Sequence, residues 1–133
     1  MKAVHNAISA RVASYGLPVM WLNSGMQPPT EPEYLRLSIM PLTVRAPFVP
    51  VGAARRLRGL IEVSCYAQRG GGMGRAWEIA DGVGSLFSRG TRLMVDNGEI
   101  TFPVGAYSTD ARVEGPRAAV SSHAEYEVLF HGD

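Results

Sequence analysis

The stretch Leu-Met-Val-Asp-Asn-Gly-Glu-Ile-Thr-Phe, residues 93–102, places an Asn-Gly pair between two short runs in which apolar and polar residues alternate. Asn-Gly is favoured in two-residue hairpin turns, because both turn positions take positive φ angles. A turn centred on this pair sets Val95 opposite Ile100 and Leu93 opposite Phe102, with all four side chains on one face. The stretch therefore predicts an antiparallel hairpin with one buried face.

Three further segments alternate with the same period of two, which is typical of half-buried strands. They span residues 34–40, 59–66 and 123–130, and we expect the first to end at Pro41 because proline lacks an amide donor. A less regular strand is expected within residues 105–114. The residues predicted to face the core are Leu35, Leu37, Ile39, Ile61, Val63, Cys65, Ala124, Tyr126, Val128 and Phe130.

Two segments instead carry apolar residues at helical spacing. Residues 2–15 form one apolar stripe, which ends before Gly16 and Pro18, and residues 75–88 form a second. The order is helix, strand, long loop, strand, helix, hairpin and strands, which favours an α+β fold. We expect a single domain, residues 1–133, with a mostly antiparallel sheet and both helices on one face.

The composition is that of an ordinary globular protein, with 46% hydrophobic and 19% charged residues and a net charge of +1. So small a net charge does not favour non-specific attraction to nucleic acid or acidic lipid. Cys65 is the single cysteine, so no intrachain disulfide can form. No apolar run approaches the roughly 18 residues of a membrane span. We expect a soluble intracellular protein.

Residues 41–57 contain three prolines beside apolar residues, and Arg55 and Arg56 lie near their end. A long segment without regular structure is uncommon in a compact domain unless it is functional or mobile. We expect it to contact another subunit. The residues assigned to that contact are Arg45, Phe48, Val49, Arg55, Arg56 and Arg58.

Residues 66–76, Tyr-Ala-Gln-Arg-Gly-Gly-Gly-Met-Gly-Arg-Ala, are rich in glycine between a predicted strand and a predicted helix. The stretch lacks the lysine and hydroxyl of a phosphate loop, and it does not fit the G-x-G-x-x-G dinucleotide pattern. We interpret it as a flexible connector, with Arg69 and Arg75 exposed to a neighbouring subunit. Phosphate binding is the alternative, because helix N-termini attract anions.

The sequence shows no catalytic constellation, and we expect neither a cofactor nor a metal. Cys65 falls on the apolar face of a strand, as a core residue would. Ser85 lacks the second glycine and the strand-to-helix turn of a nucleophile elbow. His123 and Glu125 are close enough to share a metal ion, but no third ligand is evident.

The succession of motifs resembles the small tail terminator, or tail completion, proteins of long-tailed phages and prophages, a family that includes the lambda-like terminators. The N-terminal half contributes a short first helix, Trp21, and a Pro28-Pro29 loop before Tyr-Leu-Arg-Leu at residues 34–37. Arg-Gly-Leu-Ile-Glu-Val at residues 58–63, the glycine-rich turn and Ala80-Asp81 follow. Phe-Ser-Arg-Gly-Thr at residues 87–91 then leads into the Asn-Gly hairpin.

This resemblance implies a structural virion protein at the head-proximal end of the tail, present in the host cytoplasm during assembly. Its partners would be five further copies in a homo-hexameric ring, the tail tube protein and the head–tail connector protein. No membrane and no sequence-specific nucleic acid would be involved, although DNA would pass through the ring. The alternatives are another neck or tail-tube component, or a small nucleotide-binding enzyme that uses Gly70–Gly74.

A closed ring needs two different complementary patches on each subunit. We place one on residues 44–58. The second is expected at the tip of the hairpin or on the acidic face of the last strand, where Glu125 and Glu127 would meet arginines of a neighbour.

Overall fold

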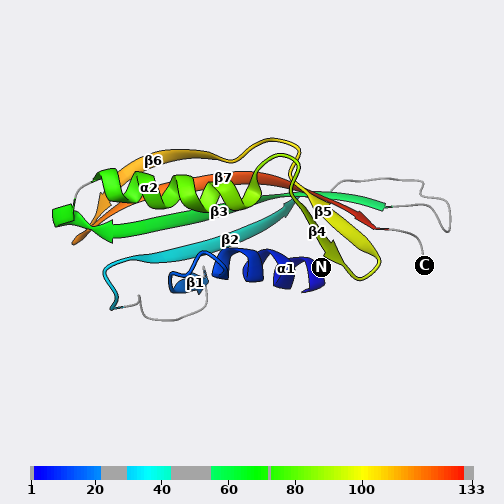
Figure 1. Ribbon diagram of the computed structural model, residues 1–133, viewed down its shortest axis with the longest axis horizontal. Helices are drawn as coiled ribbons and strands as arrows, with labels where there is room; N and C mark the ends of the chain where they lie inside the picture. The colour runs from blue at the N-terminus through cyan, green and yellow to red at the C-terminus, as the bar shows by residue number, and fades with distance from the viewer. Residues whose placement is uncertain (1, 22–29, 43–54, 72, 131–133) are drawn as a thin grey trace.

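The computed structural model describes residues 2–21, 30–42, 55–71 and 73–130 (Figure 1). A seven-stranded sheet carries two α-helices and two short 3-10 helices. In chain order the elements are α1 (Lys2–Ala13), β1 (Val19–Trp21), β2 (Tyr34–Leu42), β3 (Arg55–Gln68), η1 (Arg69–Gly71), α2 (Met73–Gly84), η2 (Ser85–Phe87), β4 (Arg92–Val95), β5 (Gly98–Thr101), β6 (Tyr107–Glu114) and β7 (Arg117–Phe130).

The strand order is β1-β2-β3-β7-β5-β4, and β6 also pairs with β7. The 14-residue strand β7 therefore has β3 along one edge, while its other edge carries β6 at the start and β5 at the end. Among the described strands, the β1–β2 pair is the parallel one and the other pairs are antiparallel. The predicted α+β class with a mostly antiparallel sheet is confirmed.

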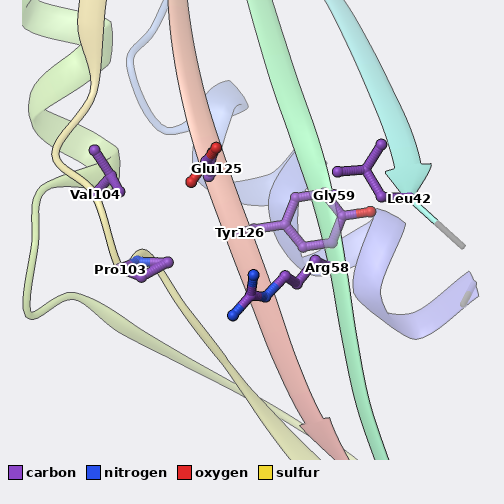
Figure 2. Close-up of a pocket in the computed structure, with 7 residues that line it drawn as sticks. All are labelled: Leu42, Arg58, Gly59, Pro103, Val104, Glu125 and Tyr126. Carbon is purple, nitrogen blue, oxygen red and sulfur yellow. The ribbon is translucent and has the colours of Figure 1, made fainter. Parts of the chain in front are cut away.

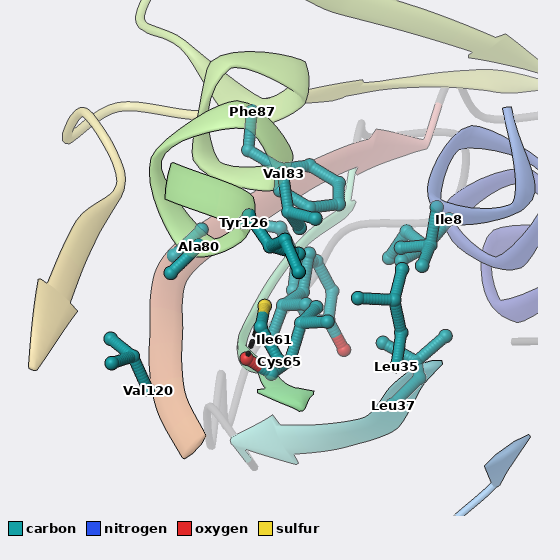
Figure 3. Close-up of a cluster of buried hydrophobic side chains, with 14 of the residues drawn as sticks. Ile8, Leu35, Leu37, Ile61, Cys65, Ala80, Val83, Phe87, Val120 and Tyr126 are labelled. Carbon is teal, nitrogen blue, oxygen red and sulfur yellow. Dashed lines mark hydrogen bonds between the residues drawn. The ribbon is translucent and has the colours of Figure 1, made fainter. Parts of the chain in front are cut away.

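Both helices pack on the same face of the curled sheet and enclose one core (Figure 3). Val4, Ile8 and Val12 of α1 are fully buried, because they recur every fourth residue along one side of the helix. From α2 the core receives Ala76, Ile79, Ala80 and Val83. We call the opposite face of the sheet, on which none of the described helices lies, the outer face.

All ten strand residues predicted to face inward lie in this core or pack against it. Ile61, Val63 and Cys65 are fully buried on β3, and Ala124, Tyr126 and Val128 are buried on β7. Ile39 and Phe130 are half-buried at the margin of the cluster. The period-two pattern therefore identified the correct face of each strand.

Several predicted strand boundaries are wrong, and β7 begins at Arg117 instead of residue 123. β2 continues through Pro41, which lies opposite Gly59, and ends at Leu42. β1 pairs with β2 at Leu35–Leu37, and Pro41 lies beyond this pairing. The missing amide of Pro41 therefore removes no hydrogen bond to β1. β3 begins at Arg55, so the last residues of the predicted loop 41–57 belong to a strand.

The hairpin forms where predicted, but its register differs. Leu93 pairs with Ile100 and Val95 with Gly98, so the turn residues are Asp96 and Asn97. The predicted pairs Val95–Ile100 and Leu93–Phe102 are wrong by two residues. A shift of two keeps every side chain on its face, which explains why the pattern did not reveal it.

Candidate subunit interface

The predicted interface residues fall in several parts of the molecule. Arg45, Phe48 and Val49 lie outside the described residues. Arg55 is the first residue of β3 and lies opposite Phe130 of β7. The remaining predicted residues can be placed with their side chains.

Arg56 and Glu127 form an ion pair within the chain. The Arg56 Nε atom lies 2.9 Å from Glu127 Oε1, across the β3–β7 pairing. The arginine side chain is 64% exposed, so water screens the pair and its contribution to stability is small. Glu127 thus has a partner in its own chain, whereas the sequence analysis gave it an arginine of a neighbouring subunit.

Arg58 and Glu125 lie on the outer face, beside a hollow of about 290 Å³ (Figure 2). Leu42 and Val104 also line the hollow, from the end of β2 and from the segment between β5 and β6. Among the residues that the structure describes, neither Arg58 nor Glu125 has an ion-pair partner. Within the described residues, this hollow therefore combines apolar walls with one cation and one anion that have no ion-pair partner.

Arg75, at the start of α2, is engaged by carboxylates. Its Nε and Nη2 atoms donate to the two carboxylate oxygens of Glu33 at 2.5 and 2.9 Å, and Nη1 donates to Glu78 at 3.1 Å. Paired donation of this kind is the strongest form of arginine–carboxylate contact. It lowers the pKa of Glu33 and raises that of Arg75. The contact fastens the chain before β2 to the beginning of α2.

Replacing Glu33 by glutamine should lower the free energy of unfolding at pH 7 by less than about 1 kcal/mol, because the pair is partly exposed. The pKa of Glu33 is lower in the folded protein than its ordinary value of 4.5, so its stabilisation is present above pH 4.5 and is lost as pH falls through the folded pKa. Urea unfolding at pH 7 and pH 3 should therefore show a difference between wild type and E33Q that shrinks in acid. The matched control is E31Q, at an exposed carboxylate two residues away; a pH dependence equal to that of E33Q would contradict the assignment.

The glycine-rich stretch is mostly helical. Arg69 opens η1, its side chain is exposed, and its backbone amide donates to the carbonyl of Pro116 at 3.0 Å. α2 begins at Met73, two residues earlier than predicted. Arg69 is therefore exposed to solvent, whereas Arg75 is held by Glu33.

The outer face also carries an array that the sequence analysis missed. The rings of Tyr34 and Tyr66 stack with centroids 4.5 Å apart. The guanidinium of Arg117 lies over Tyr34, and that of Arg36 lies over Tyr66, at 4.5 and 5.6 Å from the ring centroids. In the sequence, Tyr34 and Arg36 alternate with buried leucines, and this alternation could have placed both side chains on the outer face. Their contacts could not be predicted in this way, because the neighbours across the strands depend on the register.

Arg112 of β6 extends the array across the sheet. It donates to the hydroxyls of Ser121 and Ser64 at 3.0 and 3.2 Å and to the carboxylate of Glu114 at 2.7 Å. Both serines are buried, so these bonds satisfy hydroxyls that water does not reach. The arrangement anchors β6 beside its irregular pairing with β7 between Thr109 and Arg112.

The features considered for catalysis and metal binding occupy ordinary positions. Cys65 is fully buried, and burial raises the pKa of its thiol to about 12, which leaves it protonated at neutral pH. Ser85 lies at the start of η2 and donates to the carbonyl of Gly82. In the described ranges, no three His, Cys, Asp or Glu side chains come together as a metal site. No helix in this part of the chain is long and apolar enough to cross a membrane.

Comparison with solved structures identifies the fold. One solved structure superposes with a TM-score of 0.75 at 22% sequence identity. The alignment covers 99% of this chain and 94% of that chain. At this identity the likeness concerns the fold alone. A comparison with curated proteins gives no significant match.

Comparison with protein families identifies the family. The family model described as phage tail terminator protein matches residues 1–121. This is nearly the whole chain, and it includes every element from α1 to the first part of β7. The role is therefore a structural one in the phage tail, and the chain belongs to the phage tail terminator family.

Proposed function

We propose that six copies of this chain form a ring on the head-proximal end of the tail tube, where the ring stops tube growth and gives the head–tail connector a surface to bind. The observation that carries the proposal is the family match over residues 1–121. The partners are thus other copies of the chain, the tail tube protein and the connector protein. The proposal involves no cofactor, membrane or sequence-specific nucleic acid, and DNA passes through the ring.

The surface supports a ring because it offers two unlike patches. Cyclic assembly through heterologous contacts requires that one subunit's patch fit a different patch on the next. The outer-face hollow, with Arg58 and Glu125, lies on the β3–β7 pair. The β4–β5 hairpin forms the far edge of the sheet and bears the exposed Met94. These surfaces differ in shape and come from different elements.

The rival proposal of a nucleotide-binding enzyme has less support. A phosphate site at Gly70–Gly74 would need cations free to meet the anion. Of the two arginines beside this loop, Arg75 already donates to Glu33 through two nitrogen atoms and to Glu78 through the third, which leaves Arg69 as the exposed one. Thermal unfolding with and without ATP, GTP and NAD tests this rival, and a specific rise in Tm with one of them would support it.

The function is tested by deleting the gene in the phage or prophage that encodes it and measuring the tails by electron microscopy. We expect headless tails with tubes of variable, excessive length, and restoration of uniform length by the wild-type gene. Tails of normal length without heads would instead indicate a neck protein. A complete lack of tubes would indicate a tube component, and normal virions would contradict any role in tail assembly.

A further inference from the structure

The edge strands of the sheet differ in how well they are protected against pairing with another chain. An exposed edge is a template for a further strand, and proteins blunt it with proline, a bulge or a very short strand. β1 has three residues, and β6 is irregular between Thr109 and Arg112, where Asp110 has a positive φ of 62°. β4 contains neither a proline nor a bulge, and its Met94 is 72% exposed (Figure 1). Among the described strands, β4 is therefore the least protected edge.

The register of the hairpin decides which backbone groups of β4 point away from β5. Val95 and Gly98 flank the two-residue turn, and such a pair exchanges both of its hydrogen bonds. Bonding alternates along an antiparallel pair, so Leu93 also bonds to β5, whereas Arg92 and Met94 direct their backbone groups to the open side. Leu93 and Val95 pack against the core, so the side chains of Arg92 and Met94 lie on the outer face. β4 thus offers the carbonyl of Arg92 and the amide of Met94 to a further strand.

The end of β2 offers matching backbone groups. The amide of Leu35 donates to the carbonyl of Pro18, so every second residue from Leu35 onward directs its backbone groups to the β1 side of the strand. β1 pairs with β2 as far as Leu37. The amide and carbonyl of Ile39 therefore point to an edge that no described strand covers. Pro41, the next residue of this series, has a carbonyl but no amide, so Ile39 is the residue that can both donate and accept there.

We propose that β4 of one copy pairs in parallel with the end of β2 of the next copy, with Leu93 opposite Ile39. In this register the amide of Ile39 donates to the carbonyl of Arg92, and the amide of Met94 donates to the carbonyl of Ile39. These two bonds are the repeating unit of a parallel pair. The contact joins opposite ends of the same sheet, so it is heterologous and repeats from copy to copy. It rests on the proposed ring and names the surfaces that close it.

The partner is a second copy because strand direction and faces both fit a ring of identical chains. Four antiparallel pairings lead from β2 through β3, β7 and β5 to β4, so β4 runs in the same direction as β2. A rotation about an axis roughly along the strands preserves this direction and continues the outer face from copy to copy. Met94 then lies beside Met40, which is 45% exposed, and near Leu42, which is 47% exposed. The pairing therefore covers apolar side chains from both edges.

The proposed register staggers neighbouring copies along the strand direction. Within one chain, Ile39 lies in the row of Ala124 on β7, whereas Leu93 lies in the row of Val128, four residues further along. An even stagger keeps every side chain on its own face of the sheet. A sheet that closes on itself requires such a stagger, because its strands tilt relative to the axis. The register is therefore compatible with a closed ring.

Disulfide formation in assembled tails tests this contact. Met94 and Met40 would lie on adjacent strands about 4.8 Å apart, within the distance of about 4.4–6.8 Å that a disulfide spans between α-carbons. Tails carrying M40C/M94C are oxidised with copper phenanthroline; the native Cys65 is buried. We expect a ladder of multiples at a yield at least about tenfold above that of M94C/A111C, because pairing raises the effective concentration of the two thiols. Ala111 is an exposed position on β6. Equal yields, or a disulfide-free M40C/M94C, would overturn the proposal.

The backbone bond is tested separately at Met94. M94P removes the amide that points to the open side, whereas the matched control M94A removes the side chain and keeps the amide. Because this amide takes no part in the β4–β5 pairing, both purified variants should unfold within a few degrees of the wild-type Tm. In tails, M94P should be retained at a level at least about tenfold below that of M94A, measured by quantitative immunoblot. Equal retention would reject the backbone pairing, and a large fall in Tm confined to M94P would reject the assigned direction of the amide.

These outcomes separate the contact from the proposed function. Tails of controlled length that give no M40C/M94C ladder would reject the contact and leave the terminator role standing. A ladder formed by a protein whose deletion leaves tail length unchanged would establish the contact and reject that role.

Discussion

Replacing Gly59 by valine is expected to destabilise the protein by about 3 kcal/mol or more, among the largest effects of any single substitution in the described chain. Gly59 lies opposite Tyr126 in the β3–β7 pairing, and the tyrosine ring covers the space that a side chain at position 59 would occupy. A β-carbon at this position would overlap the ring and its hydroxyl. The glycine is therefore required by the close approach of the ring.

The tyrosine cannot give way cheaply. Its side chain is 1% exposed and lies in the core with residues from α1, α2 and the sheet (Figure 3). Inserting methyl groups into a packed core forces neighbouring side chains or backbone to shift, at a cost of about 1–3 kcal/mol. Valine adds two methyl groups beyond the overlapping β-carbon, so we expect the upper end of this range or more.

Thermal unfolding measures the effect, with an expected fall in Tm of about 10 °C or more. The matched control is Gly70→Ala, where an added β-carbon meets no atom within 4 Å, and it should change stability by less than about 0.5 kcal/mol. The cause is tested by a double-mutant cycle with Tyr126→Leu, which removes the ring. The double variant should lose much less stability than the sum of the losses of the two single variants. If the losses simply add, the tyrosine ring is not the obstacle.

The prediction from sequence succeeded where each element carries its own periodic signal. The strand of Ile61, Val63 and Cys65 alternates cleanly, and the helix of Val4, Ile8 and Val12 keeps a regular stripe. The start of β7 carries no such signal, because Ala118–Ser122 are all small or short side chains without alternation. The residues of this part of β7 are buried on both faces of the sheet and pair with β3 on one edge and β6 on the other. This part of the strand therefore becomes recognisable only from its pairing with these neighbours.

The candidate interface was less predictable because ion pairs depend on contacts between distant residues. Glu33 and Arg75 are 42 positions apart, and nothing in the pattern around either indicates the other. Arg56 and Glu127 meet only because β3 and β7 pair in one register. Exposed charge at Glu125 was foreseen from alternation, and Arg58 was assigned to the arginine cluster before the predicted strand. The hollow beside them follows from where β5 and β6 stop along β7.

Replacing Gly98 by alanine should likewise destabilise the protein strongly, by about 2–4 kcal/mol. Gly98 is buried in β5 and pairs with both Val95 and Phe130. A β-carbon there would lie 2.6 Å from the carbonyl oxygen of Leu129. The obstacle is backbone in the middle of a sheet, so relief requires β5 to move away from β7. The hairpin that presents Met94 would move with it.

Two substitutions distinguish the steric role of Gly98 within β5 from the turn position that the Asn-Gly pair predicts for it. If Gly98 were a turn residue with positive φ, asparagine would be tolerated there, because asparagine adopts that conformation more readily than most residues. The structure instead gives the positive φ, 65°, to Asn97. Asn97→Gly should therefore change stability by only a few tenths of a kcal/mol, whereas Gly98→Asn should be at least as damaging as Gly98→Ala. Urea midpoints measure all three, with Gly105→Ala as the control at an open position; a stable Gly98→Asn would restore the sequence-based register.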